Sequence, residues 1–174
     1  LIELCGGEIS VSSQPGQGSS FRFTLPLAHS SGKIADVRME TPDTETLKGM
    51  RVLLVEDNPV NQLVTRKILE IAGMQVAVAG NGEIALDYLK TEQADCVLMD
   101  LQMPVLDGFE TTRRIRQDPA LASLVVIAMT ANAASEDRRR CLEAGMNDFI
   151  TKPIRPRALY DALIAIRQTF NPPH

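Results

Sequence analysis

The sequence predicts an α/β domain with a doubly wound, five-stranded parallel sheet and helices on both of its faces. Two observations lead to this prediction. Short apolar runs alternate along residues 51–170 with longer stretches whose apolar residues recur every three or four positions, a pattern typical of alternating strands and helices. The run at 124–129 (LVVIAM) is apolar throughout, as expected for a strand covered on both faces of a parallel sheet. Because crossovers between parallel strands are right-handed, we expect the strand order 2-1-3-4-5.

The first two strand–helix units follow this pattern. The run at 51–55 (RVLLV) predicts a strand, and apolar positions within 60–71 are spaced four, four and three residues apart, as on one face of a helix. Gly73 predicts the end of that helix. The run at 75–79 (QVAVA) predicts the second strand, and the apolar positions within 84–89 predict the second helix.

The other three units have the same organisation. Their predicted strands are 95–99, 124–129 and 147–150. A helix at 108–116 is broken by Asp118 and the proline after it. Ser135 is expected to cap the fourth helix, because two acidic residues follow it in the first turn, and Gly145 is expected to close that helix. The last helix is expected after Pro156.

The chain divides into three zones. Residues 1–27 form a short piece in which EISVSS and SFRFTLPL alternate apolar and polar residues, as the strands of a β-hairpin do. Residues 28–50 predict a linker, because they are polar and show no sustained period; a short helix at 42–47 is only weakly indicated. Residues 51–170 form the main domain.

Composition excludes several classes of function. The net charge of −4, and the acidic residues around the basic run 138–140, argue against a nucleic-acid surface. The three cysteines include no C-x-x-C pair, which fits free thiols in a reducing cytoplasm, and neither histidine has metal-ligand spacing. No apolar run is long enough to span a membrane, and no signal peptide opens the chain. Because the chain begins with Leu1 in mid-pattern, we expect a fragment of a longer protein. The fragment is expected to be cytoplasmic, and an inner-membrane anchor is left open for the parent protein alone.

Polar residues stand where four of the predicted strands end. Glu56 and Asp57 follow the first strand, Asp100 the third, Thr130 the fourth and Lys152 the fifth. Ligands of an open parallel sheet bind outside the carboxyl ends of its strands, so the topology is expected to gather these five side chains at one edge. One acid at a strand end would be routine in any α/β protein, and it is the complete set that indicates a site.

These five residue types together suit the binding of a metal ion and a phosphoryl group. Three carboxylates that lie close together repel one another, and a hard divalent cation with a preference for oxygen, such as Mg²⁺, relieves the repulsion. Thr130 can donate a hydrogen bond to a phosphoryl oxygen, and the Lys152 ammonium can pair with another. Asp100 is therefore the candidate nucleophile for a phosphoryl group, with an acyl phosphate as the product.

The main domain resembles the response-regulator receiver family, which has the flavodoxin-like fold. The resemblance covers about 120 of the 174 residues, and the matching stretches, in order, are VLLVEDNPVNQ, VLMDLQMPVLDG, VVIAMTANA and GMNDFITKPI. It implies phosphorelay signalling in which Asp100 takes a phosphoryl group from a phosphohistidine on a partner. Thr130 matches the hydroxyl residue that takes part in the family's switch. Lys152 matches the lysine that the family has after its fifth strand.

The resemblance also implies a metal site and a switch. Asp57 and Asp100 would bind Mg²⁺ directly, together with the backbone carbonyl of Gln102, and Glu56 would bind it through water. Phe149 occupies the aromatic switch position, where many members have Tyr. Two further implications are a cis peptide between Lys152 and the next proline and an influence of Gln102 and Asn132 on the lifetime of the aspartyl phosphate.

Residues 1–27 resemble the carboxyl-terminal end of a histidine-kinase ATP-binding domain, in which a helix ends at Gly-Gly and a hairpin with a Pro-Gly-x-Gly turn follows. The nucleotide site and any phosphorylatable histidine box are absent, so the fragment is not expected to act as a kinase. The order of kinase tail, linker and receiver resembles a hybrid sensor histidine kinase. It implies two partners, the kinase's phosphohistidine domain and a histidine phosphotransfer domain, with the receiver as a relay intermediate and no DNA-binding domain.

Two alternatives remain open on the sequence. A phosphatase with an aspartyl-phosphate intermediate would usually have a second Asp two residues after the nucleophile, where this chain has Gln102. A phosphorylation-independent interaction module would usually have lost an acid, the hydroxyl or the lysine, and this chain keeps them all. A flavin site is disfavoured, because the loop after the first strand is acidic and has no Ser/Thr-rich phosphate cradle.

Overall fold

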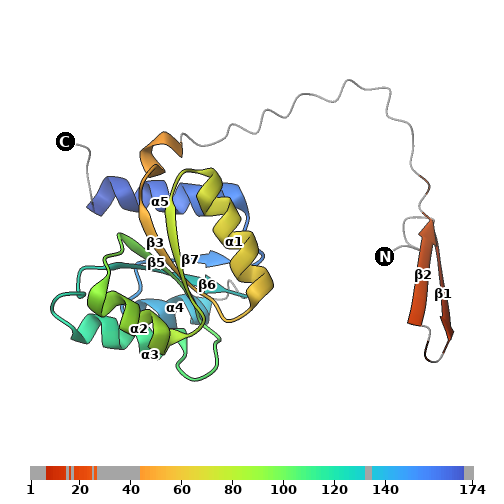
Figure 1. Ribbon diagram of the computed structural model, residues 1–174, viewed down its shortest axis with the longest axis horizontal. Coiled ribbons are helices and arrows are strands. Elements are labelled where there is room, and N and C mark those ends of the chain that lie inside the picture. Colours follow the sequence, from red (N-terminus) through yellow and green to blue (C-terminus); the bar gives the residue numbers. More distant parts are fainter. Residues whose placement is uncertain are drawn as a thin grey trace. The chain divides into compact units, whose positions relative to one another are not determined.

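The computed structural model describes residues 7–14, 16, 18–24, 26, 44–131 and 135–170. The chain divides into two compact units, Leu1–Met39 and Glu40–His174. Within the first unit, strand β1 (Glu8–Gln14) pairs antiparallel with β2 (Gly18–Thr24), so the predicted hairpin is confirmed (Figure 1). Gly16 and Gly18 have positive φ angles of 79° and 93°, which the reversal between the strands requires. The helix expected before the hairpin, up to Gly6, lies outside the described residues.

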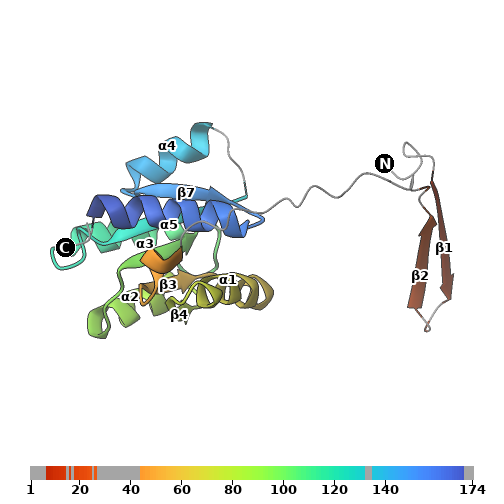
Figure 2. The ribbon, with the colours of Figure 1, turned by 90° about the horizontal axis from the view of Figure 1, so that it is seen from above.

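The second unit contains a five-stranded parallel sheet. Its strands are β3 (Arg51–Val55), β4 (Gln75–Ala79), β5 (Cys96–Asp100), β6 (Val125–Thr130) and β7 (Asp148–Thr151). Their order is β4-β3-β5-β6-β7, which is the predicted 2-1-3-4-5 counted within this domain. Strands β4 and β7 are therefore the edges of the sheet, as Figure 2 shows from above.

Five α-helices of the described residues cover the two faces of this sheet, and Figure 1 shows their arrangement. They are α1 (Pro59–Ile71), α2 (Gly82–Thr91), α3 (Gly108–Gln117), α4 (Ser135–Glu143) and α5 (Pro156–Phe170). Helices α1 and α5 pack on one face through a cluster that includes Leu69, Leu159 and Leu163, and the other three pack on the opposite face through Ala85, Ile115 and Cys141. Burial on both faces explains why β5 and β6 are apolar almost throughout.

Local signals set the helix ends. The side chain of Asn58 accepts hydrogen bonds from the backbone N–H groups of the first turn of α1, and Asp107 does the same for α3. Gly73 and Gly145, with φ angles of 78° and 92°, follow the ends of α1 and α4 as predicted. Helix α4 begins at Ser135, but the expected capping contact of this side chain lies outside the described residues.

Three strands end one residue later than predicted. Strands β5, β6 and β7 extend to Asp100, Thr130 and Thr151, and each of these polar residues still has a partner in the ladder: Asp100 pairs with Met129, and Thr130 with Thr151. The apolar pattern ends before the hydrogen-bonded ladder does, because the ladder is made by the backbone. The sheet therefore fixes the backbone of both site residues directly.

The composition of residues 44–50 predicts a linker, whereas the structure packs this segment against the domain. Residues Thr44–Leu47 form a short 3₁₀ helix, η2, in which Leu47 is fully buried. Met50 is 5% exposed and belongs to the same core cluster as α1 and α5. Two buried side chains in seven residues are too few to make a detectable period, which is why the pattern did not reveal them.

Candidate phosphoacceptor site

The carboxyl-terminal edge of the sheet brings the five predicted site residues together. Glu56 and Asp57 follow β3, Asp100 ends β5, Thr130 ends β6, and Lys152 follows β7. All five line one cavity of about 250 Å³. The parallel topology places them there, because the strand ends of a doubly wound sheet converge although their positions in the sequence are far apart.

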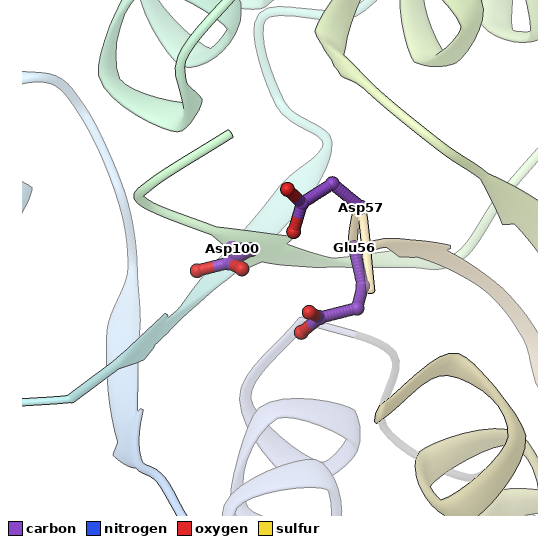
Figure 3. Close-up of side chains that lie close together, drawn as sticks. All are labelled: Glu56, Asp57 and Asp100. Atoms are coloured by element: carbon purple, nitrogen blue, oxygen red, sulfur yellow. The ribbon is translucent and has the colours of Figure 1, made fainter. Parts of the chain in front are cut away.

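Three carboxylates form the acidic side of this cavity. One oxygen from each of Glu56, Asp57 and Asp100 lies within 4.8 Å of the others. Figure 3 shows these three side chains close together. Glu56 is 1% exposed and Asp100 6%, whereas Asp57 is exposed. An all-oxygen donor set that is open to solvent on one side suits Mg²⁺, which retains several waters.

Lys152 bridges the two buried acids. Its Nζ donates hydrogen bonds to Oε2 of Glu56 at 2.6 Å and to Oδ2 of Asp100 at 2.7 Å. Burial raises the pKa of Asp100 above that of an ordinary Asp, and the Lys152 ammonium opposes this. Burial by itself would lower the pKa of Lys152, but the hydrogen bonds to Asp100 and Glu56 outweigh it, so the pKa of Lys152 is raised. Lys152 is therefore a firmly charged ammonium in the site. The peptide bond that follows it is cis, as expected.

The first turn of α1 fixes Glu56 in place. The Asn61 side chain donates to Oε1 of Glu56 at 3.0 Å, and the Asn58 backbone N–H donates to the same oxygen at 3.3 Å. The Gln62 side chain donates to the Glu56 carbonyl at 2.6 Å. Both oxygens of Glu56 are thus hydrogen-bonded. Asn61 and Gln62 were not predicted as site residues, although they end the family-like stretch VLLVEDNPVNQ one turn after the acidic pair.

A tight loop follows Asp100. The Gln102 backbone N–H donates to Oδ1 of Asp100 at 3.3 Å, which orients the carboxylate. The Leu106 N–H donates to the Pro104 carbonyl, so the chain reverses at Val105, whose positive φ of 71° is unusual for a β-branched residue. The Gly108 N–H returns to the Leu101 carbonyl at 3.2 Å.

The remaining predicted residues lie in different surroundings. Thr130 is 5% exposed and lines the cavity. Phe149 is half-buried on β7, where the guanidinium carbon of Arg138 lies 5.6 Å from its ring centroid. Asn132 lies outside the described residues. Phe109 and Arg140, which the sequence pattern did not indicate as site residues, also line the cavity.

The fold and the site define the chain as a signalling domain of the two-component class, with an acidic pocket at the carboxyl edge of a five-stranded parallel sheet. Residues 52–164 match the family model of the response regulator receiver domain. This chain therefore belongs to the response regulator receiver family. Among its described residues, no helix is both long and apolar enough to cross a membrane.

Two curated relatives extend this comparison. The chain is 36% identical over 173 residues to the autoinducer 2 sensor kinase/phosphatase LuxQ of Vibrio parahaemolyticus, covering 98% of this chain and 20% of that protein. It is 36% identical over 160 residues to the aerobic respiration control sensor protein ArcB of Escherichia coli, covering 91% of this chain and 20% of that protein. The chain thus spans about a fifth of the length of these relatives.

One solved structure bears on the site. The receiver domain of the sensor histidine kinase PA1611 from Pseudomonas aeruginosa is 40% identical and superposes with a TM-score of 0.62, covering 69% of this chain and 96% of that one. That structure has a magnesium ion coordinated in its active site cleft.

Proposed function

We propose that Asp100 accepts a phosphoryl group from a phosphohistidine in a Mg²⁺-dependent step of a phosphorelay. One observation carries this proposal: the Asp100 carboxylate lies 2.7 Å from the Lys152 ammonium and within 4.8 Å of two further carboxylates in a single cavity. A nucleophile between an ammonium and an oxygen-ligand metal site is suited to phosphoryl transfer, in which the enzyme chiefly positions groups and stabilises charge.

The residues present fit a magnesium ion. Asp57, Asp100 and the backbone carbonyl of Gln102 would hold it directly, and Glu56, whose oxygens already accept from Lys152 and Asn61, would hold it through water. When bound, the ion neutralises charge on the transferring phosphoryl oxygens. The magnesium in the related Pseudomonas receiver supports this assignment.

The chain's own residues supply the rest of the reaction. An Oδ of Asp100 attacks the phosphorus in line, a P–O bond forms as the P–N bond to the imidazole breaks, and the electron pair of that bond returns to the imidazole nitrogen. Lys152 keeps its contact with Glu56 and exchanges Asp100 Oδ2 for a phosphoryl oxygen, and Thr130 donates to another. Thr130 and Phe149 then bias the surface around α4, β7 and α5 toward a second state.

A partner surface adjoins α1. Val60, Leu63 and Val64 are 67%, 59% and 50% exposed at helical spacings of three and four residues, so they make one apolar stripe that begins next to the acidic pair. Exposed apolar stripes of this kind mark interaction surfaces. We propose that a helical domain carrying the phosphohistidine, either that of a sensor kinase or a histidine phosphotransfer domain, docks on this stripe. The kinship with sensor kinases supports a parent chain that is a hybrid histidine kinase.

The alternatives are less well supported. The complete set of acids, hydroxyl and lysine in one cavity disfavours an interaction module that does not use phosphorylation. A phosphatase would need a second acid two residues after Asp100, and Gln102 stands there. Turnover of a small phosphate ester such as p-nitrophenyl phosphate would support the phosphatase hypothesis instead.

Phosphorylation of variants tests the proposal. The unaltered chain, incubated with radiolabelled acetyl phosphate and Mg²⁺, should acquire an acid-stable, base-labile label. Asp100→Asn should abolish it, and EDTA should suppress it. Asp87→Asn is the matched control, because Asp87 is an exposed acid that pairs only with Lys90 among the described residues. Label retained in the Asp100 peptide of the Asn variant would refute the assignment.

A further inference from the structure

Two residues that the proposed reaction does not use line the cavity beside Asp100. Phe109, in the first turn of α3, is 8% exposed, and Arg140, on α4, is exposed. The guanidinium carbon of Arg140 lies 4.5 Å from the centroid of the Phe109 ring. A cation therefore lies over an aromatic ring in the lining of the cavity that contains Asp100.

The partners of the three α4 arginines distinguish Arg140 from its neighbours. Arg139 pairs with Glu143 at 3.6 Å, and Arg138 lies over the Phe149 ring. For Arg140, the described part of the chain supplies the Phe109 ring and no carboxylate. A cation–π contact at an exposed site is weak, whereas a guanidinium binds phosphate oxygens through two charge-assisted hydrogen bonds. A phosphoryl group in the cavity would therefore compete successfully for this guanidinium.

The sum of the charges in the cavity also favours a further cation near Asp100. Phosphorylation replaces the single negative charge of Asp100 by a group of about −2 at neutral pH. With Glu56, Asp57, Lys152 and a divalent cation in place, the pocket then carries one uncompensated negative charge. Among the described residues that line the cavity, Arg140 is the one cation besides Lys152, and its charge would balance this excess.

We infer that Arg140 is a second phosphoryl-binding cation, which rests on the Phe109 ring in the unphosphorylated state and moves onto the phosphoryl oxygens when Asp100 is modified. The inference rests on the proposed function and adds a residue to its binding site. It also gives the charge at Asp100 a direct connection to α4, the helix whose Arg138 covers Phe149.

Binding of beryllofluoride, a phosphoryl analogue, tests this inference by isothermal titration with Mg²⁺ present. Arg140→Gln should weaken the affinity roughly tenfold, the size expected for a partly exposed charge-assisted contact, and Arg140→Lys should recover part of the loss. Arg139→Gln, the matched control on the same helix, should change it less than about twofold. The difference between unaltered chain and Arg140→Gln should shrink in high salt, because Arg140 is exposed.

Removal of the Phe109 ring distinguishes a role of Arg140 in binding from a role in packing. Phe109→Leu should free Arg140 and tighten beryllofluoride about two- to fivefold, opposite in sign to Arg140→Gln. Equal affinities for Arg140→Gln and the unaltered chain, or a loss of the same size in Phe109→Leu, would overturn the inference and leave the proposed function standing. No beryllofluoride binding by the unaltered chain would overturn the proposed function and the inference together.

Discussion

Lys152 is the counter-ion of two acids that the protein buries. Glu56 is 1% exposed and Asp100 6%, and the ammonium lies 2.6 and 2.7 Å from their oxygens. A buried carboxylate is tolerated only when a partner and hydrogen bonds replace the lost water. In the absence of a metal ion, Lys152 and the amides around Glu56 provide that replacement.

Removal of this ammonium should make stability depend on metal. We expect Lys152→Ala to lower the free energy of unfolding by about 2–3 kcal/mol in EDTA, because two buried charges lose their counter-ion. Saturating Mg²⁺ should recover more stability in this variant than in the unaltered chain, because the ion binds the same carboxylates. Urea unfolding with and without Mg²⁺ measures this. Lys90→Ala, which removes an exposed ion pair, is the control; equal Mg²⁺ effects in all three chains would contradict the expectation.

A third acid, Asp95, lies at the opposite end of the strands, just before β5 begins. It accepts hydrogen bonds from the backbone and the guanidinium of Arg51, at 2.8 Å and 2.6 Å, beside the larger cavity of about 560 Å³ at the amino ends of the strands. Burial by itself would raise the pKa of Asp95, but these bonds outweigh it and the pKa is lowered. This contact ties the start of β3 to the residue that precedes β5.

The lowered pKa of Asp95 fixes a pH dependence. Because the pKa is lower in the folded state than the ordinary 3.8, the pair stabilises the fold above pH 3.8, and the contribution is lost as the pH falls through the folded-state pKa. We expect Asp95→Asn to cost about 1 kcal/mol at pH 7, since Arg51 is partly exposed, and the difference to close below pH 3.8. Urea unfolding across this range checks it. A difference that stays constant down to pH 3 would show that the charge of Asp95 is not the cause.

At the scale of elements, the approach of α3 to the end of β5 shapes the loop after Asp100. Gly108 is the first residue of α3, and a Cβ built on it would lie 2.2 Å from the backbone oxygen of Asp100. Only a glycine allows the helix to start this close to the strand. The α3 start, the cap at Asp107 and the carboxylate of Asp100 are therefore positioned together.

Gly108→Ala should displace this junction. We expect a loss of about 2 kcal/mol in the free energy of unfolding, because backbone must move to relieve the contact, together with weakened Mg²⁺ binding. Gly80→Ala is the matched control, since a Cβ there meets nothing within 4 Å. Urea unfolding and calorimetric Mg²⁺ titration measure the two effects. Unchanged Mg²⁺ affinity in Gly108→Ala would show that the position of this junction does not affect metal binding.

At the scale of the whole molecule, the face covered by α1 and α5 depends on residues before the first strand. Leu47 and Met50 belong to the core cluster on that face, and the Gly49 N–H donates to the Gly73 carbonyl at 2.9 Å. The domain that folds as a unit thus includes η2 as well as the region that matches the family model.

Two fragments test where the domain starts. A chain that begins at residue 51 should be less stable than one that begins at residue 40 by about 3 kcal/mol or more, because it lacks the fully buried Leu47 and its neighbour Met50. Leu47→Ala in the longer fragment should reproduce most of the loss, and Leu142→Ala, at a 58% exposed position, should not. Thermal and urea unfolding of the four chains measure this. Equal stability of the two fragments would assign residues 44–50 to the linker after all.

The sequence by itself determined the elements and the chemistry at their ends. Periodicity follows from the geometry of helices and strands, so the alternation of elements and the strand order were predictable. The acids, Thr130 and Lys152 were predictable as a set because parallel strands end at one edge. The hairpin was predictable because its two alternating segments flank a glycine-containing turn.

Only the tertiary structure decided which side chains from different elements meet. Asn61 holds Glu56, Arg140 lies over Phe109, and Leu47 fills the core beneath α1 and α5. None of these pairings leaves a local period, because each depends on how separately formed elements pack. For the same reason the last residues of β5 and β6 were set by the backbone ladder, where the apolar pattern had already ended.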